Sequence, residues 1–204
     1  MSKITKRIIA IGLCVALVGT WGFFFKRANS VQKSPKIEVT KKNEALIDKE
    51  LGIKIQFVSK KECKVSDILE PTSPYYKSFL MNQPITPENI QKLDNDYRVF
   101  IIETSVTNIT DKPIPYKRPY FKLGIDAHQM DYDLELVYAL MDKYGESNPD
   151  PAEKKEIQPN ETVKYKTAYR SNAMEMPRKM LEELNFDDMY LTYRAYPVKQ
   201  ILEI

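Results

Sequence analysis

Residues 97–108 read YRVFIIETSVTN, and this stretch decides the fold because its apolar side chains pass from two faces to one. Over residues 99–102 apolar side chains fill both faces of an extended chain. Thr104 and Val106 then continue one face, while the opposite face turns polar. A strand buried on both sides at one end and on one side at the other belongs in the middle of a sheet. The following residues, 108–115, are rich in Asn, Thr, Asp and Pro and predict a turn.

Five further segments alternate apolar and polar residues with the period of two that is typical of half-buried strands. They are Ile53–Ser59, Phe121–Ile125, His128–Tyr138, Val163–Arg170 and Met189–Tyr196. Two short helices are expected between them, one that begins at Thr86 and Pro87 and ends near Asn95, and one over residues 177–184. The pattern therefore predicts a mainly β chain, an antiparallel sandwich with one or two short helices.

The segment that starts at His128 allows a second interpretation. Asp133 and Gly145 are residue types that cap the two ends of a helix. Against this, apolar or aromatic residues and His128 recur at every second position up to Tyr138. This period favours a strand over residues 128–138, followed by a charged loop over residues 142–160.

The N-terminal part contains eighteen consecutive residues without a charge, from Ile8 to Phe25, with basic residues on both sides. A helix of that length spans about 27 Å, close to the hydrocarbon core of a bilayer at ~30 Å. We predict a cytoplasmic n-region at residues 1–7, a transmembrane signal anchor in the lipid bilayer at 8–25, a basic solvated linker at 26–50, and an extracytoplasmic domain at 51–204.

Two alternatives to a signal anchor remain open. A cleaved signal peptide, which would leave a secreted protein, requires small residues after the apolar run, whereas bulky rings stand at residues 23–25. A lipid-modified Cys14 requires a small residue before it, whereas Leu13 stands there.

Three basic residues precede the span and six lie between Lys26 and Lys42, so the charge count does not set the orientation. We favour an inside N-terminus because a short basic segment is the usual start of an export signal.

Charge and cysteine content argue against a nucleic-acid-binding domain and against a domain held together by disulfides. Five of the 31 Lys and Arg residues precede Ala28 and none of the 28 acidic residues does, so the remainder carries a net charge of −2. Such a domain offers no electrostatic reason to bind nucleic acid. Cys63 is the single cysteine after the apolar run, so an intramolecular disulfide is impossible and a packed core must hold the domain together.

Four segments resemble a known class of domain: YRVFIIETSVTNITDKPI, YFKLGID, IQPNETVKYKTAY and MYLTYRAY. They look like the immunoglobulin-like, telokin-like ectodomains of uncharacterised Gram-positive lipoproteins and membrane-anchored proteins. The resemblance covers residues 53–196 and implies a β-sandwich outside the membrane. It implies no activity, since these motifs mark strands and turns. The chain departs from the pattern in its missing lipobox and in a long insertion at residues 71–95.

Few residues suit catalysis or metal binding. His128 is the single histidine, and although Asp126, Asp131 and Asp133 lie near it, alternate strand residues point to opposite faces. Cys63 has no histidine near it in sequence, and the isolated glycines form no phosphate-binding loop. We expect no enzyme, no metal site and no cofactor.

The remaining interpretation is a non-catalytic, membrane-anchored extracytoplasmic module of a bacterial cell envelope that binds an unknown protein or cell-wall component. The alternative is an accessory component of an envelope assembly such as a secretion or conjugation machine. The candidate contact surface is the proline-rich segment at residues 71–87, whose candidate binding residues are Tyr75, Tyr76, Phe79 and Met81. These rings either meet a partner or close an open edge of the core.

Overall fold

The computed structural model describes residues 17–27, 35–80, 83–125, 128–145, 148–150, 154–172 and 176–204. The chain divides into two compact units, Met1–Lys36 and Ile37–Ile204. In the first unit residues 17–27 are helical, whereas the predicted n-region and residues 8–16 of the predicted membrane span lie outside the described residues. None of the described helices is both long and apolar enough to cross a membrane.

The second unit is built on a four-stranded sheet with the order β2 (Leu46–Asp48), β3 (Ile53–Cys63), β4 (Tyr97–Asn108) and β9 (Thr162–Asn172). All of its neighbouring strands are antiparallel. β4 pairs along nearly its whole length with both β3 and β9. The prediction that residues 97–108 form an inner strand is therefore confirmed.

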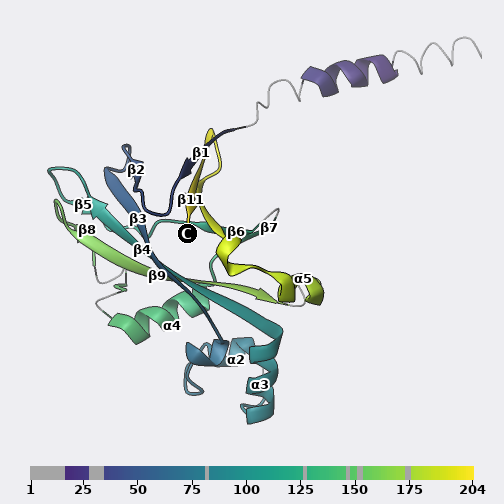
Figure 1. Ribbon diagram of the computed structural model, residues 1–204, viewed down its shortest axis with the longest axis vertical. Coiled ribbons are helices and arrows are strands. Elements are labelled where there is room, and N and C mark those ends of the chain that lie inside the picture. Colours follow the sequence, from purple (N-terminus) through teal and green to yellow (C-terminus); the bar gives the residue numbers. More distant parts are fainter. Residues whose placement is uncertain are drawn as a thin grey trace, which may run out of the picture. The chain divides into compact units, whose positions relative to one another are not determined.

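A five-stranded sheet packs over one face of the four-stranded sheet (Figure 1). Its order is β1 (Lys36–Thr40), β11 (Val198–Glu203), β10 (Tyr190–Arg194), β6 (Lys122–Ile125) and β7 (His128–Met130). Between the two sheets lies a core that includes Ile55, Phe100, Ile102, Leu123 and Leu191. The two short strands β5 (Ile114–Pro115) and β8 (Glu156–Ile157) pair only with each other. The architecture is a β-sandwich with a few helices, as the sequence predicts.

Helices cover the opposite face of the four-stranded sheet, as Figure 1 shows for α2 (Tyr76–Phe79), α3 (Pro87–Asp96) and α4 (Leu134–Tyr144). Together with η1 (Val65–Asp67) they bury a second core, to which β4 contributes Tyr97 and Val99. Burial on both faces explains the continuous apolar run at residues 99–102. Two short elements, α5 (Arg178–Glu183) and η3 (Phe186–Asp188), precede β10.

The predicted strand over residues 128–138 is wrong beyond β7, because α4 occupies Leu134–Tyr144. Asp133 caps this helix, since its carboxylate accepts a hydrogen bond from Leu136 N at 3.0 Å. Leu136 and Leu140, four residues apart, are fully buried against the sheet. The cap and the packing of one helical face therefore decide the structure, and not the alternation of residue types. That alternation treated Leu134 and Tyr138 as core positions, whereas both are exposed.

Three further segments differ from prediction. The expected linker at residues 26–50 contains β1 and β2, since β1 pairs with β11 and Leu46 of β2 is buried in the first core. β11 follows the last expected strand, and α2 interrupts the expected loop at residues 71–87. Strands of three to six residues whose burial depends on a distant partner leave little periodicity in the sequence.

The expected start of α3 is confirmed in detail. Thr86 is its N-cap, and the Thr86 hydroxyl accepts a hydrogen bond from Asn89 N at 3.3 Å. Pro87 occupies the first helical position, where a missing N–H costs nothing. The second predicted helix, over residues 177–184, corresponds to α5.

Removal of the hydroxyl group is expected to have opposite effects on stability at two buried tyrosines, one in each core. The Tyr76 hydroxyl is buried without a hydrogen-bond partner among the described residues, whereas the Tyr169 hydroxyl donates to Phe121 O at 3.2 Å. We expect Tyr76→Phe to raise the free energy of unfolding by about 1 kcal/mol and Tyr169→Phe to lower it by about 1 to 3 kcal/mol. Urea unfolding measures both, and equal effects of the two substitutions would contradict this assignment.

Candidate functional site

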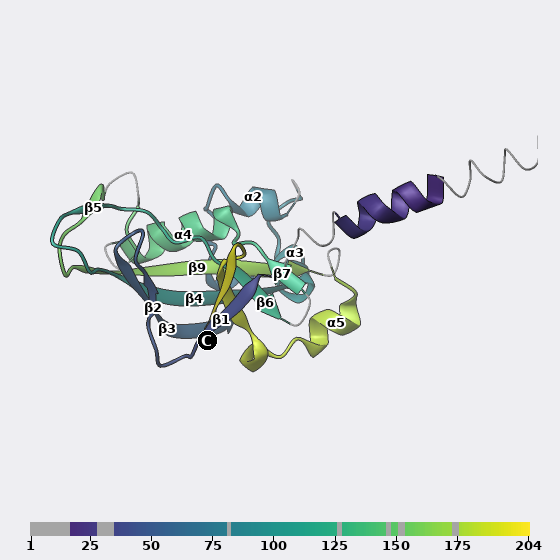
Figure 2. The same ribbon diagram turned by 90° about the horizontal axis from the view of Figure 1, so that it is seen from above.

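A cleft with a volume of about 560 Å³ opens at one end of the sandwich. Both views place β5 at the same end of the domain as β2 (Figures 1 and 2). The cleft is lined by Glu50, Leu51, Ile53, Val106, Ile114, Pro115, Lys117, Arg118, Pro119, Tyr120, Ile157, Tyr193 and Arg194. It is a candidate ligand site because pockets of about 300 to 1,000 Å³ with apolar walls and few polar groups are typical of such sites.

The apolar part of the cleft is continuous with the first core. Ile53, Val106 and Ile157 line the cleft and belong to the buried cluster between the sheets. Ile114 packs against the same cluster from β5. Ile53, Val106 and Ile157 are buried, so the accessible apolar lining comes from Leu51, Ile114 and Pro115. Ile114 and Pro115 belong to β5, which pairs with β8 and not with either main sheet.

Asp48 holds the two sheets together beside the cleft. Its Oδ1 accepts hydrogen bonds from Glu50 N and Leu51 N, both at 3.0 Å. Its Oδ2 accepts from the Tyr193 hydroxyl at 2.8 Å and from the Arg194 guanidinium at 2.7 Å. Asp48 ends β2 of the four-stranded sheet, whereas Tyr193 and Arg194 belong to β10 of the five-stranded sheet. The carboxylate therefore fixes the distance between the sheets where Tyr193 and Arg194 line the cleft.

The Asp48 carboxylate is ionised in spite of its burial. Burial alone would raise its pKa, but the hydrogen bonds from Leu51 N and Tyr193 and the charge of Arg194 outweigh burial and lower the pKa below its ordinary value of 3.8. A folded-state pKa below the unfolded one adds stability at pH values above the unfolded pKa. That stability is lost as the pH falls through the folded-state pKa.

Arg118, in the segment between β5 and β6, is one of the residues that line the cleft. Its guanidinium donates to Lys166 O and to Asn148 Oδ1, each at 3.0 Å, and lies 5.2 Å from the centre of the Tyr165 ring. Burial lowers the pKa of Arg118, although a guanidinium stays charged in proteins. Within the described residues, no carboxylate forms an ion pair with Arg118. Arg194 differs, because Asp48 and Glu50 both pair with it.

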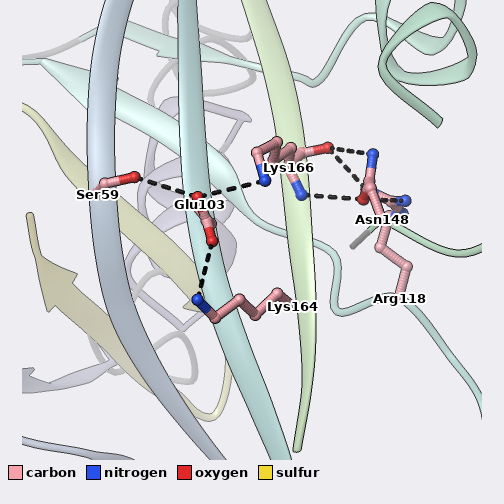
Figure 3. Close-up of polar contacts among 6 residues, drawn as sticks. All are labelled: Ser59, Glu103, Arg118, Asn148, Lys164 and Lys166. Atoms are coloured by element: carbon pink, nitrogen blue, oxygen red, sulfur yellow. Dashed lines mark hydrogen bonds and ion pairs between the residues drawn. The ribbon is translucent and has the colours of Figure 1, made fainter. Parts of the chain in front are cut away.

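Asn148 positions Arg118 and closes the outer edge of β9 (Figure 3). Its fully buried carboxamide accepts from Lys166 N at 2.9 Å and donates to Lys166 O at 3.3 Å. These two bonds replace those that a further strand would make. Asp133 N, which donates to Ala168 O at 2.9 Å, occupies the same edge further along. Strand addition to β9 is therefore blocked at these two positions.

The polar network of Figure 3 continues from Asn148 across the four-stranded sheet. The ammonium groups of Lys164 and Lys166 lie 3.6 Å and 3.4 Å from the Glu103 carboxylate, which also accepts from the Ser59 hydroxyl at 3.3 Å. With Arg118, the six residues drawn comprise three cations and one carboxylate. The network around Arg118 thus has an excess of positive charge.

The predicted contact residues do not form a common surface. Tyr76 and Phe79 are buried in the second core, so their predicted role at the surface is corrected to packing under α2. Tyr75 is half-buried and stacks on Tyr138 of α4, with 6.3 Å between the ring centres. Met81 lies outside the described residues. The segment closes the core, which was the alternative interpretation of its rings, and a binding role for Tyr75 stays a prediction.

None of the described residues weighed for chemistry is part of the cleft lining. His128 is exposed on the edge strand β7, and Asp126 lies outside the described residues. Asp131 forms a hydrogen bond with Tyr120 and an ion pair with Lys122. No group of three or more His, Cys, Asp or Glu in the described part of the chain could hold a metal ion.

Cys63 packs at the edge of the second core, and burial raises the pKa of its thiol to about 11. A thiol with such a pKa is almost entirely protonated at neutral pH, where the thiolate is the nucleophile.

Sequence reasoning missed the residues that shape the cleft. Asp48 lies in the expected linker, and Asn148 in the expected loop over residues 142–160. Arg118 follows Lys117 and precedes Pro119 in a stretch without periodicity. Since all three act through partners distant in sequence, no local signal identifies them.

Comparison with known proteins finds solved structures of low sequence identity. No protein-family model and no curated protein matches the chain. A conserved hypothetical protein from Bacillus anthracis is 14% identical with a TM-score of 0.44, over 78% of this chain and 92% of that one. An uncharacterized β-sandwich protein from Clostridium difficile is 10% identical with a TM-score of 0.46, over 85% and 97%. The yjhA protein from Bacillus subtilis is 11% identical with a TM-score of 0.43, over 83% and 98%.

We expect Asp48→Asn to lower the free energy of unfolding at pH 7 by about 1.5 to 3 kcal/mol, the usual contribution of hydrogen bonds to a charged group. The loss should shrink as the pH falls below the ordinary value of 3.8 and disappear below the lower folded-state pKa, where the folded Asp48 carboxylate also becomes protonated. Asp187→Asn is the matched control, since Asp187 is highly exposed and its ion pair with Lys60 should contribute less than about 1 kcal/mol. Urea unfolding at pH 7 and pH 3 measures both, and a loss that is independent of pH would contradict the role of Asp48.

Proposed function

We propose that this protein is a non-catalytic binding module that takes its ligand in the cleft at the open end of the sandwich. The observation that carries this proposal is the cleft itself, with a volume of about 560 Å³ and a lining that includes Arg118. No carboxylate among the described residues pairs with this arginine. Ile53, Val106 and Ile157 hold the apolar wall in place from three different strands. A site of this kind binds by exclusion of water and a few polar contacts.

The chemistry around the cleft supports binding more than catalysis. All four hydrogen bonds to Asp48 stabilise its charged form, so this carboxylate is a poor proton acceptor for a substrate. A non-covalent contact with a ligand, in contrast, requires no proton transfer from the ligand to the protein. Tyr193 lies on the lining, and burial and the hydrogen bond to Asp48 raise the pKa of its hydroxyl. This shift disfavours ionisation of the hydroxyl at neutral pH.

We place this module in a Gram-positive cell envelope. In this proposal residues 8–25 anchor the chain in the membrane, and the sandwich, an immunoglobulin-like domain of the telokin-like type, stands outside the cell. The charge-free stretch of eighteen residues and the single cysteine beyond it support the proposal. The second function that we keep is a component of an envelope assembly, in which the N-terminal helix contacts other membrane segments.

Protease treatment of intact cells tests the location. We expect added protease to degrade residues 37–204 while a cytoplasmic marker protein stays intact, because the proposed domain lies outside the membrane. Lysed cells serve as the control in which both are degraded. Survival of the domain in intact cells, together with degradation of a known outer-face protein, would contradict the proposed orientation.

A photoreactive amino acid tests the cleft. Placed at Ile114, which lines the cleft, it should crosslink to a ligand or partner in living cells. Placed at Ile85, an exposed residue before α3, it should give none of the same adducts. Identical adducts from both positions would rule out the cleft as the binding site. Adducts to membrane proteins from Trp21, with none from Ile114, would favour the envelope assembly instead.

A further inference from the structure

Arg118 is an unusual feature of the cleft because it is a largely buried charge with no counter-charge. Two of its N–H groups donate to Lys166 O and Asn148 Oδ1, and the others have no acceptor among the described residues. Removal of a cation from water is costly unless an anion pairs with it. The two acceptors that it has are neutral, so they orient the guanidinium without offsetting its charge.

The surroundings of Arg118 increase this imbalance. The cleft lining carries the cations Lys117, Arg118 and Arg194, and the carboxylates of Glu50 on the lining and Asp48 beside it both pair with Arg194. Glu50 is already within 3.0 Å of Arg194, which leaves Arg118 as the guanidinium with unused donors. Behind it, Lys164 and Lys166 share the one carboxylate of Glu103 (Figure 3). An anion at Arg118 would relieve the repulsion among these cations.

The guanidinium is also held in place for such a contact. Asn148 is fully buried, and its carboxamide is fixed by both backbone groups of Lys166. The Tyr165 ring lies 5.2 Å from the guanidinium carbon and restricts it further. A fixed, planar set of donors suits a carboxylate, which accepts two parallel hydrogen bonds from a guanidinium.

The lining and the volume of the cleft indicate the polarity and the size of the rest of the ligand. Leu51, Ile114 and Pro115 are the accessible apolar residues of the lining, whereas Ile53 and Ile157 are buried. The volume of about 560 Å³ lies within the range for a small molecule. An extended peptide would need a free strand edge for its backbone, and Asn148 already occupies the edge of β9 at Lys166.

We infer that the cleft binds a small amphipathic carboxylic acid, with its carboxylate on Arg118 and its apolar chain against Leu51, Ile114 and Pro115. This inference rests on the proposed function of the cleft as a binding site. It adds the chemical class of the ligand and the residue that recognises its charge.

Hexanoate and hexanamide test the inference because they have the same length and differ in charge. Their affinities are measured by NMR titration of the full chain in nanodiscs of zwitterionic lipid, with empty nanodiscs as the reference. We expect hexanoate to bind at least ten-fold more tightly than hexanamide. Arg118→Gln should abolish this difference. Lys92→Gln, which removes the same charge from an exposed position on α3, should retain it.

A second substitution protects the test against misfolding of the first. Asn148→Asp keeps the Arg118 side chain and supplies a carboxylate to its guanidinium, so the preference for hexanoate should disappear without any change at Arg118. Equal affinity of the unchanged protein for acid and amide would overturn the inference but leave the cleft as a binding site. A preference for the acid that survives Arg118→Gln would overturn the role of Arg118.

The source of the carboxylate is tested separately. An acetylated Val-Ile-Leu peptide with a free carboxyl end is compared with hexanoate on the same protein. Binding of the peptide ten-fold more tightly than hexanoate would overturn the small-molecule assignment in favour of a peptide terminus. Absence of hexanoate binding at millimolar concentration would overturn the inference as well, whereas the crosslinking experiment at Ile114 decides the proposed function independently.

Discussion

The pairing of β4 with β3 and β9 is the constraint on which the remaining structure depends. β4 exchanges backbone hydrogen bonds with both neighbours, and its side chains alternate between two cores. Phe100 and Ile102 face the five-stranded sheet, whereas Tyr97 and Val99 face the helices. Each face needs a cover, because exposed apolar residues in a row would be costly. The sandwich partner and the helical layer are both answers to that requirement.

The second cover explains the aromatic residues of the proline-rich segment. Tyr76 and Phe79 complete the core beneath α2, together with Leu136 and Leu140 of α4. Beyond Ile101 this face becomes polar at Glu103, whose carboxylate pairs with Lys164 and Lys166 of β9. The end of α4 contacts this charged network, because the Lys166 ammonium lies 4.6 Å from the centre of the Tyr144 ring.

The sequence predicts those parts of the fold that pack periodically. Alternation located the centres of β3, β4, β6, β9 and β10, and the Thr86–Pro87 pair located the start of α3. It failed at residues 134–138, where one pattern of residue types is compatible with two structures and the cap at Asp133 decides. It also failed at β1 and β2, because short edge strands take their stability from β11 and β3.

The cleft was less predictable than the fold for a physical reason. Its lining includes residues of β5 and β8, which pair with each other and not with either main sheet. Two residue pairs of β-structure carry no recognisable period in the sequence. The polar groups of the site are held by contacts over long sequence separations, such as Asp48 with Arg194 and Arg118 with Lys166.

The two arginines of the cleft illustrate how similar groups acquire different roles. Arg194 forms ion pairs with Asp48 and Glu50, and the pair with Asp48 joins the two sheets. Arg118 is held by the neutral oxygens of Asn148 and Lys166, so its charge stays available. Because Asn148 uses the same carboxamide to close the edge of β9, the orientation of Arg118 is coupled to the completion of the four-stranded sheet. Within the described part of the chain, Arg118 is thus the arginine of the cleft lining that no carboxylate pairs with.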